Sequence, residues 1–202
     1  MRRQRLDDAN AQRALEHMLA HLDGLDAQLA AIEHELAELA TSEPWSDPVR
    51  WLCSFRGIAI RTALALLAEI GDFRRFGSAR ELMSFLGLTV AEYSSGDRQH
   101  RGHLTKTGNR HARRLLVEAA WHYQHPPRRP ARAAALAEHV PPAVSARAWQ
   151  AQIRLHHRHR HLTSHGKRST VATAAVAREL AGFIWAAMTQ QPLRTQELSA
   201  AA

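Results

Sequence analysis

Residues 49–71, VRWLCSFRGIAIRTALALLAEIG, decide the fold class of this chain. They predict a short helix over 49–55, a tight turn over 56–59 and an apolar helix from about 60 to 70 that Gly71 closes. Two helices joined in this way form a helix–hairpin–helix pattern. In that pattern the backbone N–H groups of the turn and the start of the second helix can face a phosphate. An ordinary αα-hairpin without a ligand is the alternative.

A long helix is predicted before this hairpin, over residues 9–40. Its apolar residues recur at alternating steps of three and four, which is the heptad pattern of a coiled coil. These residues are Leu15, Met18, Leu22, Leu25, Leu29, Ile32, Leu36 and Leu39. The alternative is an amphipathic helix that lies on the chain's own body. Residues 41–48, TSEPWSDP, contain two prolines and separate this helix from the rest.

Helix signals continue after the hairpin. Ser78 and Glu81 form a capping box that begins a helix, and Asn109 is the expected N-cap of a helix through about Tyr123. Further expected elements are a short extended piece near 89–93, a Pro-Arg linker at 124–132, and two helices at about 142–164 and 168–189.

The predicted fold class is therefore mainly α. A long coiled-coil helix at 1–43 precedes a compact helical domain at 49–190, which contains the helix–hairpin–helix element at 49–71. We expect a polar loop at 91–109 and a disordered tail at 191–202.

The charges divide between these two parts. Of 202 residues, 27 are Lys or Arg and 19 are Asp or Glu, a net charge of +8. Residues 1–48 carry 4 basic and 10 acidic residues, net −6, whereas residues 49–202 carry 23 and 9, net +14. Of the 27 basic residues 25 are Arg, which binds phosphate bidentately and stacks on bases. The composition therefore favours a nucleic-acid partner for the basic body.

The composition also excludes other classes of protein. No uninterrupted apolar run approaches the ~20 residues of a membrane-spanning helix, and the first residues lack the apolar core of a secretory signal. Cys53 is the only cysteine, which excludes an internal disulfide framework and a cysteine-based zinc site. We expect a cytoplasmic, nucleoid-associated protein with no membrane partner.

Residues 91–109, AEYSSGDRQHRGHLTKTGN, carry the most chemistry. A serine hydroxyl can attack a phosphodiester where neighbouring cations stabilise the developing charge. Residues 105–109 lead into a helix and offer a phosphate cradle at its positive end. The alternative is a solvated loop without chemistry, and spacing alone does not separate Ser95 from Ser94. The residues expected to contact DNA are Arg56, Gly57, Gly96, Arg98, Arg101, Thr105, Lys106, Asn109, Arg110, Arg113, Arg114 and Lys167.

Two further groups of residues are candidates for a functional role. His157, His161 and His165 share one helical face and invite a metal site, but the arginines beside them would repel a cation, so we favour a basic helix without metal. Trp45, between the two prolines, is the candidate for an exposed contact. Four aromatic residues are expected to pack in the core: Trp121, Tyr123, Trp149 and Trp185.

Taken together, residues 50–123 resemble the C-terminal transposase domain of the insertion-sequence 110/116/902 family, the bridge-RNA-guided DEDD transposases. The similar motifs are GIAIRTALALLAEIGDFRRFGSARELMSFLGL (57–88), EYSSG (92–96) and GHLTKTGNRHARRLLVEAAWHY (102–123). Residues 148–167 and 171–186 resemble the tail of the same family. The resemblance extends over roughly residues 10–190.

The resemblance implies a role for the serine directly before the glycine, Ser95: it attacks a DNA phosphodiester and forms a covalent protein–DNA intermediate. It also implies that an acidic RuvC-like domain of a partner subunit, absent from this chain, completes the site and binds Mg²⁺. The chain itself is then expected to bind no cofactor and to be inactive alone.

The partners that the resemblance implies are DNA, a guide RNA and full-length transposase, with a homo-oligomer formed through residues 15–39. The alternative is a truncated, non-catalytic module that binds nucleic acid or regulates by dimerisation.

Overall fold

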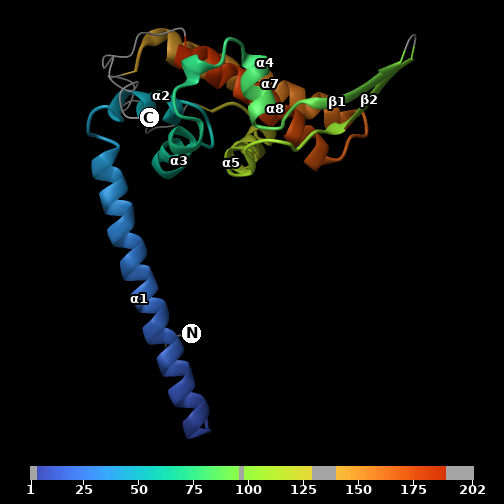
Figure 1. Ribbon diagram of the computed structural model, residues 1–202. Helices are drawn as coiled ribbons and strands as arrows, with labels where there is room; N and C mark the ends of the chain where they lie inside the picture. Colours follow the sequence, from blue (N-terminus) through green and yellow to red (C-terminus); the bar gives the residue numbers. More distant parts are fainter. Residues whose placement is uncertain (1–3, 96–97, 129–139, 190–202) are drawn as a thin grey trace.

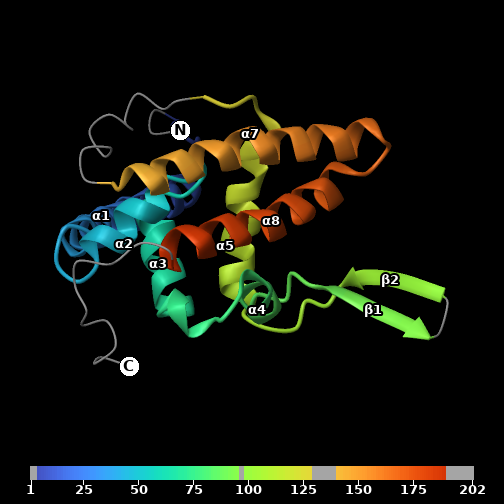
Figure 2. The same ribbon diagram turned by 90° about the horizontal axis from the view of Figure 1, so that it is seen from above.

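The computed structural model describes residues 4–95, 98–128 and 140–189. It has three parts: a long helix, a body of packed helices and a two-stranded arm, with the long helix and the arm extending from opposite ends of the body (Figures 1 and 2). The mainly α fold predicted from the sequence is confirmed.

Helix α1 spans Ala9–Leu39 and projects away from the body (Figure 1). The Asp8 side chain caps it by accepting backbone N–H groups, and the bonds from Ala11 and Asn10 lower the pKa of that carboxyl. No residue within α1 is buried. The alternative in which this helix lies on the chain's own body is therefore wrong, and the helix meets the body only near its C-terminal end.

The body consists of short and long helices in the order expected from the sequence. They are α2 Ser46–Cys53, α3 Ile60–Ile70, η1 Phe73–Arg75, α4 Ala79–Phe85, α5 Arg110–Trp121, η2 His122–Gln124, α7 Pro142–Ser164 and α8 Ser169–Thr189. The predicted caps are present: the Ser78 side chain accepts the Glu81 N–H at 3.3 Å, and Gly71 ends α3 with φ at +67°. Helix α2 begins at Ser46, before the predicted start at residue 49.

Helix α8 is the centre of the core. It packs against α7, α5 and α4, and its buried residues include Val176, Leu180 and Ile184. Among the described residues, it is the one helix with the length and hydropathy of a membrane span, and half of that window is buried inside the body. Burial against several helices is the property of a core helix, and its length and composition alone are weak grounds for a membrane span.

Two of the four aromatic residues expected in the core, Tyr123 and Trp185, take those places. Tyr123 is fully buried, Trp185 packs against the core and donates from Nε1 to the Phe76 carbonyl at 3.0 Å, and Trp121 and Trp149 are half-buried. Trp45 was predicted to be exposed, and this is wrong: it is half-buried and packs against the core where α1 joins the body.

The arm is an antiparallel pair of strands, β1 Val90–Ser95 and β2 Arg98–Leu104. A register shift lies between Val90 and Glu92, close to the body. The sequence predicted a polar loop over 91–109 with only a short extended piece near 89–93. Instead, Val90–Ser95 and Arg98–Leu104 pair as antiparallel strands, and Leu104 packs against the core.

Candidate nucleic-acid interface

Ser95 lies at the outer end of the arm. Strand β1 ends at Ser95 and β2 begins at Arg98, and these two residues are opposite each other in the backbone register. Nearer to the body, the backbone of Arg101 is opposite that of Glu92. The predicted nucleophile is thus carried on an extended ribbon that reaches beyond the helices (Figure 2). Gly96 lies outside the described residues.

The base of the arm is a close crossing of two segments, 85–89 and 105–109. Three backbone hydrogen bonds join them: Thr105 N–H to Thr89 O at 2.9 Å, Lys106 N–H to Gly87 O at 3.1 Å and Asn109 N–H to Phe85 O at 2.8 Å. A β-carbon at Gly87 or Gly108 would collide with the backbone of the opposite segment, and both residues have positive φ. The crossing therefore requires glycine at both positions and fixes the arm to the body.

This crossing uses backbone N–H groups that we expected, from the sequence, to bind a phosphate. The backbone N–H groups of Thr105, Lys106 and Asn109 donate inside the fold. The Asn109 side chain accepts the Ala112 N–H at 2.9 Å, which confirms the predicted N-cap of α5. These hydrogen bonds show that the segment acts first as a structural joint.

A carboxylate lies beside the start of α5. Glu69 accepts a hydrogen bond from Asn109 Nδ2 at 2.6 Å and lies 2.8 Å from His111 Nδ1. The hydrogen bonds from Asn109 and then His111 lower the pKa of the Glu69 carboxyl, so it stays negatively charged. That charge opposes a phosphate at this helix end, and the geometry does not favour the predicted cradle.

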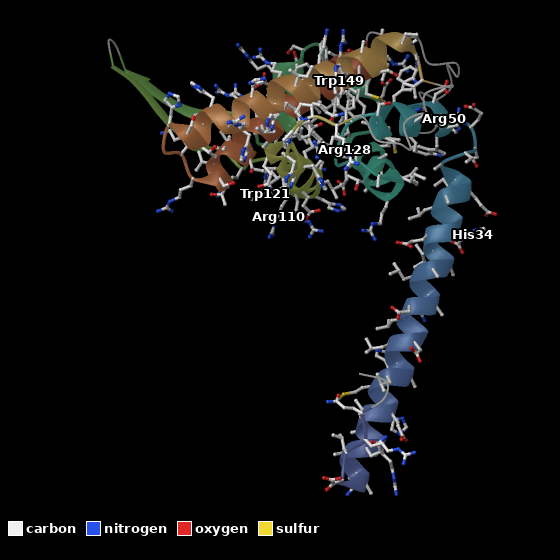
Figure 3. The ribbon with its side chains drawn as sticks, turned by 180° about the vertical axis from the view of Figure 1, so that it is seen from behind. His34, Arg50, Arg110, Trp121, Arg128 and Trp149 are labelled. Atoms are coloured by element: carbon white, nitrogen blue, oxygen red, sulfur yellow. The ribbon has the colours of Figure 1, made fainter. Side chains whose placement is uncertain are left out.

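The three arginines expected on α5 differ in their surroundings. Arg113 is half-buried and donates from Nη1 to the Leu86 carbonyl at 2.9 Å, so it also holds the base of the arm. Arg114 is exposed and pairs with Glu118 at 3.1 Å. Arg110 is exposed on the surface of the body (Figure 3). Arg110 and Arg114 are therefore the two that remain accessible to a phosphate.

The turn between α2 and α3 is built into the body. Gly57 has φ +85°, and a β-carbon there would lie 2.6 Å from the Ala119 carbonyl oxygen of α5. Arg56 donates to the carbonyls of His125 and Pro126 at 3.3 and 2.7 Å. Both residues were expected to contact DNA, and both are used inside the fold.

What remains exposed at this turn is the start of α3. Its N-cap, Ala59, provides no side-chain hydrogen bond, and Arg61 is 71% exposed beside it. Arg61 lies 3.6 Å from Glu33 of α1. The start of α3 is therefore the exposed part of the predicted helix–hairpin–helix element, and its contact with a phosphate stays a prediction.

The far end of α7 is basic. Lys167 lies in an exposed turn, where Gly166 has φ +77°.

Within the described parts of the chain, no three His, Cys, Asp or Glu side chains are grouped so that they could hold a metal ion. The ring of His165 lies 2.7 Å from the His161 carbonyl, so it contacts backbone.

The structure separates the histidines of α7 into two sets that the sequence analysis did not distinguish. His157 and His161 are exposed, whereas His156 and His159 are buried, at 8% and 6% exposure. The sequence does contain a signal for this difference in burial, because His156 and His159 lie one turn apart beside Leu155 on the apolar face of the helix.

The sequence also contains a signal for the hairpin, since Gly96-Asp97 is a residue pair typical of two-residue hairpin turns.

Comparison with known proteins supports the resemblance seen in the sequence. Residues 49–134 match the sequence profile of the "Transposase IS116/IS110/IS902 family". The chain is 43% identical over 169 residues to "Putative transposase y4qE" of Sinorhizobium fredii, an alignment that covers 82% of this chain and 43% of that protein.

Two further relatives agree. "Transposase for insertion sequence element IS1328" of Yersinia enterocolitica is 28% identical over 178 residues, covering 88% of this chain and 46% of the relative. "Insertion element IS110 uncharacterized 43.6 kDa protein" of Streptomyces coelicolor is 34% identical over 104 residues, covering 52% and 25%. The chain spans less than half the length of each of these relatives. Its helical body with the serine-bearing arm is therefore a domain of the IS116/IS110/IS902 transposase family.

Proposed function

We propose that this domain is the DNA-binding and serine-bearing part of an insertion-sequence transposase, and that Ser95 attacks a DNA phosphodiester. The observation that supports the proposal is the position of Ser95 at the end of an arm whose base is fixed to the body. A nucleophile in this position can reach a phosphate that another domain holds, and the body need not enclose the DNA.

The proposed step balances as a transesterification. The Ser95 oxygen forms a bond to phosphorus, one P–O ester bond of the DNA breaks, and the hydroxyl proton ends on the leaving DNA oxygen. Arg98 and Arg101 follow Ser95 in the arm and add positive charge near it in the chain. Cations near a reacting phosphate stabilise the charge that develops in the transition state.

Among the described residues, no three His, Cys, Asp or Glu side chains are grouped so that they could hold a metal ion. We propose that an acidic RuvC-like domain of a partner subunit supplies the metal, and that this chain is inactive without it.

The partners belong to the proposal as well. DNA contacts are assigned to the accessible basic residues Arg110, Arg114 and Lys167, with the start of α3 as a further contact. A guide RNA is the second nucleic-acid partner. The apolar stripe of α1 is assigned to a coiled coil with another copy or with full-length transposase. We propose that the protein acts in the cytoplasm, at the nucleoid.

A covalent-trapping experiment tests the chemistry. The chain is mixed with labelled target DNA, guide RNA, Mg²⁺ and the separately supplied acidic domain of a full-length relative, then denatured and resolved. Wild type and Ser94→Ala should form a protein–DNA adduct, and Ser95→Ala should not. Ser94 is a matched control because it is the neighbouring residue in the same strand.

DNA binding is measured in the same samples, because binding and chemistry can fail separately. If a handful of arginines contact phosphates, the log–log slope of affinity against salt should be about −4 to −6. A flat salt response would remove the nucleic-acid proposal itself. Adducts that persist in Ser95→Ala would remove only the assigned nucleophile.

A second candidate function is regulation by mixed oligomers. The observation in its favour is the exposed apolar stripe of α1, where Met18 is 66% exposed and Ile32 53%. If the chain inhibits co-expressed full-length transposase through this stripe, Leu25→Asp with Leu29→Asp should abolish inhibition. The control Ala27→Asp with Ala31→Asp adds the same charge off the stripe and should leave inhibition intact. Equal inhibition by both variants would exclude this function.

A further inference from the structure

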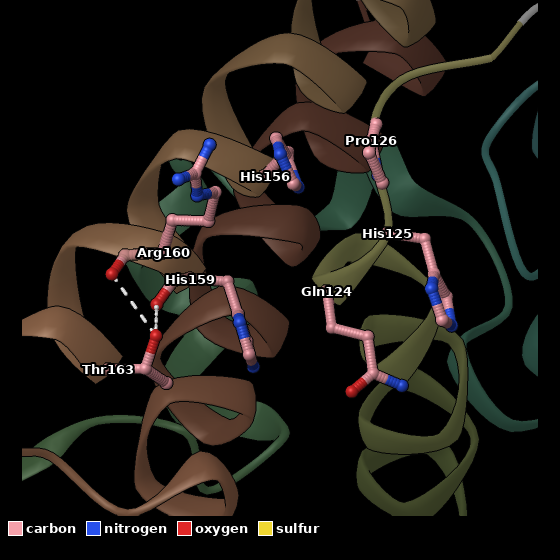
Figure 4. A pocket seen from close by; sticks show the side chains of 7 residues that line it. All are labelled: Gln124, His125, Pro126, His156, His159, Arg160 and Thr163. Atoms are coloured by element: carbon pink, nitrogen blue, oxygen red, sulfur yellow. Dashed lines mark hydrogen bonds between the residues drawn. The ribbon is translucent and has the colours of Figure 1, made fainter.

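A pocket of about 440 Å³ lies between α7 and the segment that follows α5. Figure 4 shows Gln124, His125 and Pro126 on one side and His156, His159 and Arg160 on the other. No acidic side chain is among the described residues that line it. Apart from Pro126, these residues carry groups that are cationic, can become cationic or donate hydrogen bonds.

The outer wall of the pocket is held in place by the rest of the fold. Arg56, from the turn between α2 and α3, donates to the carbonyls of His125 and Pro126. Two residues further on, the Arg128 N–H donates to Gln152 of α7 at 3.3 Å. Hydrogen bonds therefore fix this segment both to the turn between α2 and α3 and to α7. The pocket is thus a preformed feature of the body.

Two buried histidines, His156 and His159, line this space. His156 Nδ1 lies 3.1 Å from the Tyr123 carbonyl oxygen, and because a carbonyl only accepts, this nitrogen carries the proton. His159 Nε2 lies 3.4 Å from the Ser169 hydroxyl. Within the described residues, neither ring makes a second hydrogen bond, so each keeps one nitrogen for a ligand.

The charges favour an anion as that ligand. Burial, and then the neighbouring His156, lowers the pKa of His159, so the empty pocket disfavours its charged form. A bound anion would reverse this effect and draw a proton onto the ring. Arg160 is exposed at the rim and carries a permanent charge. Arg160 can donate to the oxygens of a phosphate group, and His156 can donate to them from its second nitrogen only when that nitrogen is also protonated.

We propose that this pocket binds a phosphate group of a nucleic-acid strand. The inference rests on the proposed function, because it adds a second contact for the same nucleic acid. Helix α5 runs from the base of the arm to the pocket, and its 12 residues span about 18 Å at about 1.5 Å per residue. A strand bound along α5 would therefore meet the arm at one end and the pocket at the other.

The test compares two arginines of α7 that are both exposed. Arg160 lines this pocket, whereas Arg158 lines a separate hollow with His157, His161 and Glu179 of α8. Affinity is measured for a labelled DNA oligonucleotide, the same sequence as RNA, and the same DNA with neutral methylphosphonate linkages. Arg160→Gln should weaken binding by about 3- to 10-fold and make the salt slope shallower by about 0.7 to 0.9. Arg158→Gln should change affinity less than about twofold.

His159→Gln tests the proton linkage. Wild-type affinity should rise between about pH 7.5 and about pH 5.5, and His159→Gln should lose much of that rise while His157→Gln keeps it. Thermal unfolding of each variant confirms that it is folded. The neutral oligonucleotide should bind weakly to all variants, and preference for DNA or RNA identifies the source of the phosphate.

The outcomes separate this inference from the proposed function. If wild type binds nucleic acid but Arg160→Gln and Arg158→Gln weaken it equally, the pocket is overturned and the proposed function stands. If wild type binds no nucleic acid, inorganic phosphate is titrated while the histidine side-chain NMR signals are followed. Shifts confined to His156 and His159 would support a phosphate site for another ligand, and no shifts would overturn the pocket as well.

Discussion

Helix α1 and the arm both project from the body, but they are attached and composed differently. The helix presents apolar residues to solvent, including Met18 and Leu22 at 66% and 54% exposure, and meets the body only near its end. The arm is polar, and its base is fixed by backbone hydrogen bonds and by two glycines in close contact.

The difference indicates two kinds of partner. An exposed apolar stripe at heptad spacing is suited to another helix, whose side chains would cover it. A polar ribbon with a fixed base is suited to placing one residue, Ser95, at a set distance from the body. If α1 and the arm have these separate roles, substitutions in one should leave the role of the other unchanged.

The largest effect is expected at the base of the arm. Gly108→Ala should lower the free energy of unfolding by about 2–4 kcal/mol, because the new β-carbon meets the Phe85 backbone at a positive φ. Gly24→Ala in α1 has nothing within 4 Å and should stabilise that helix by up to about 1 kcal/mol. Denaturant unfolding followed by tryptophan fluorescence measures the body. Equal effects at the two sites would contradict the contrast between the projections.

The next effect concerns α1. Leu25→Asp with Leu29→Asp should weaken self-association by at least about 100-fold, because charged side chains would have to be buried in the coiled coil. Light scattering over a range of concentrations measures this change. Ala27→Asp with Ala31→Asp should leave the oligomer unchanged. A wild-type chain that is monomeric at all concentrations would show that α1 does not pair with its own copy.

A smaller effect should separate two arginines one residue apart in α5. Arg113→Ala should cost about 1–2 kcal/mol of stability because the Leu86 carbonyl loses its donor. Arg114→Ala should change stability by less than about 0.5 kcal/mol, since its pair with Glu118 is exposed, but should weaken DNA binding. Chemical denaturation and oligonucleotide titration give the two readouts. The reverse assignment would contradict the structural role of Arg113.

The smallest effect is a difference in acid response between the body and α1. His159 and Asp8 both have lowered pKa values in the fold, so the folded state binds fewer protons and stability falls as pH falls. For the body, stability begins to fall when the pH drops below 6.5, the ordinary pKa of histidine, and it continues to fall as the pH passes the lowered pKa of His159. For the first turn of α1 it begins only below the ordinary aspartate value of 3.8.

Stability measured between these two values should therefore change for the body and not for the start of α1. His159→Gln should reduce the dependence of body stability on pH, and His157→Gln, on the exposed side of α7, should leave it unchanged. If neither substitution changes the slope of body stability against pH, His159 does not control the pH dependence.

Local signals made much of this fold predictable. Heptad spacing located α1, and the side chains of Ser78 and Asn109 located two helix starts, because a cap acts on backbone groups within three residues of itself. The outer part of the hairpin was missed because its residues are polar on both strands and show no apolar alternation.

The roles of the site residues were harder to predict, because they depend on contacts between distant segments. Arg56 and Gly57 look like DNA contacts in the sequence, but their partners are some 60 to 70 residues away in α5 and the segment after it. Arg113 likewise differs from Arg114 only through a carbonyl 27 residues earlier. The position of Ser95 at the end of an arm also required the tertiary structure.

The central claim is that the arm delivers Ser95 to a DNA phosphate. The most direct measurement is to digest the trapped protein–DNA adduct with protease and nuclease and to locate the residual nucleotide phosphate by mass spectrometry. The account predicts the modification on Ser95, in the peptide that contains β1. A phosphate bonded to Ser94, or to any residue outside the arm, would contradict it.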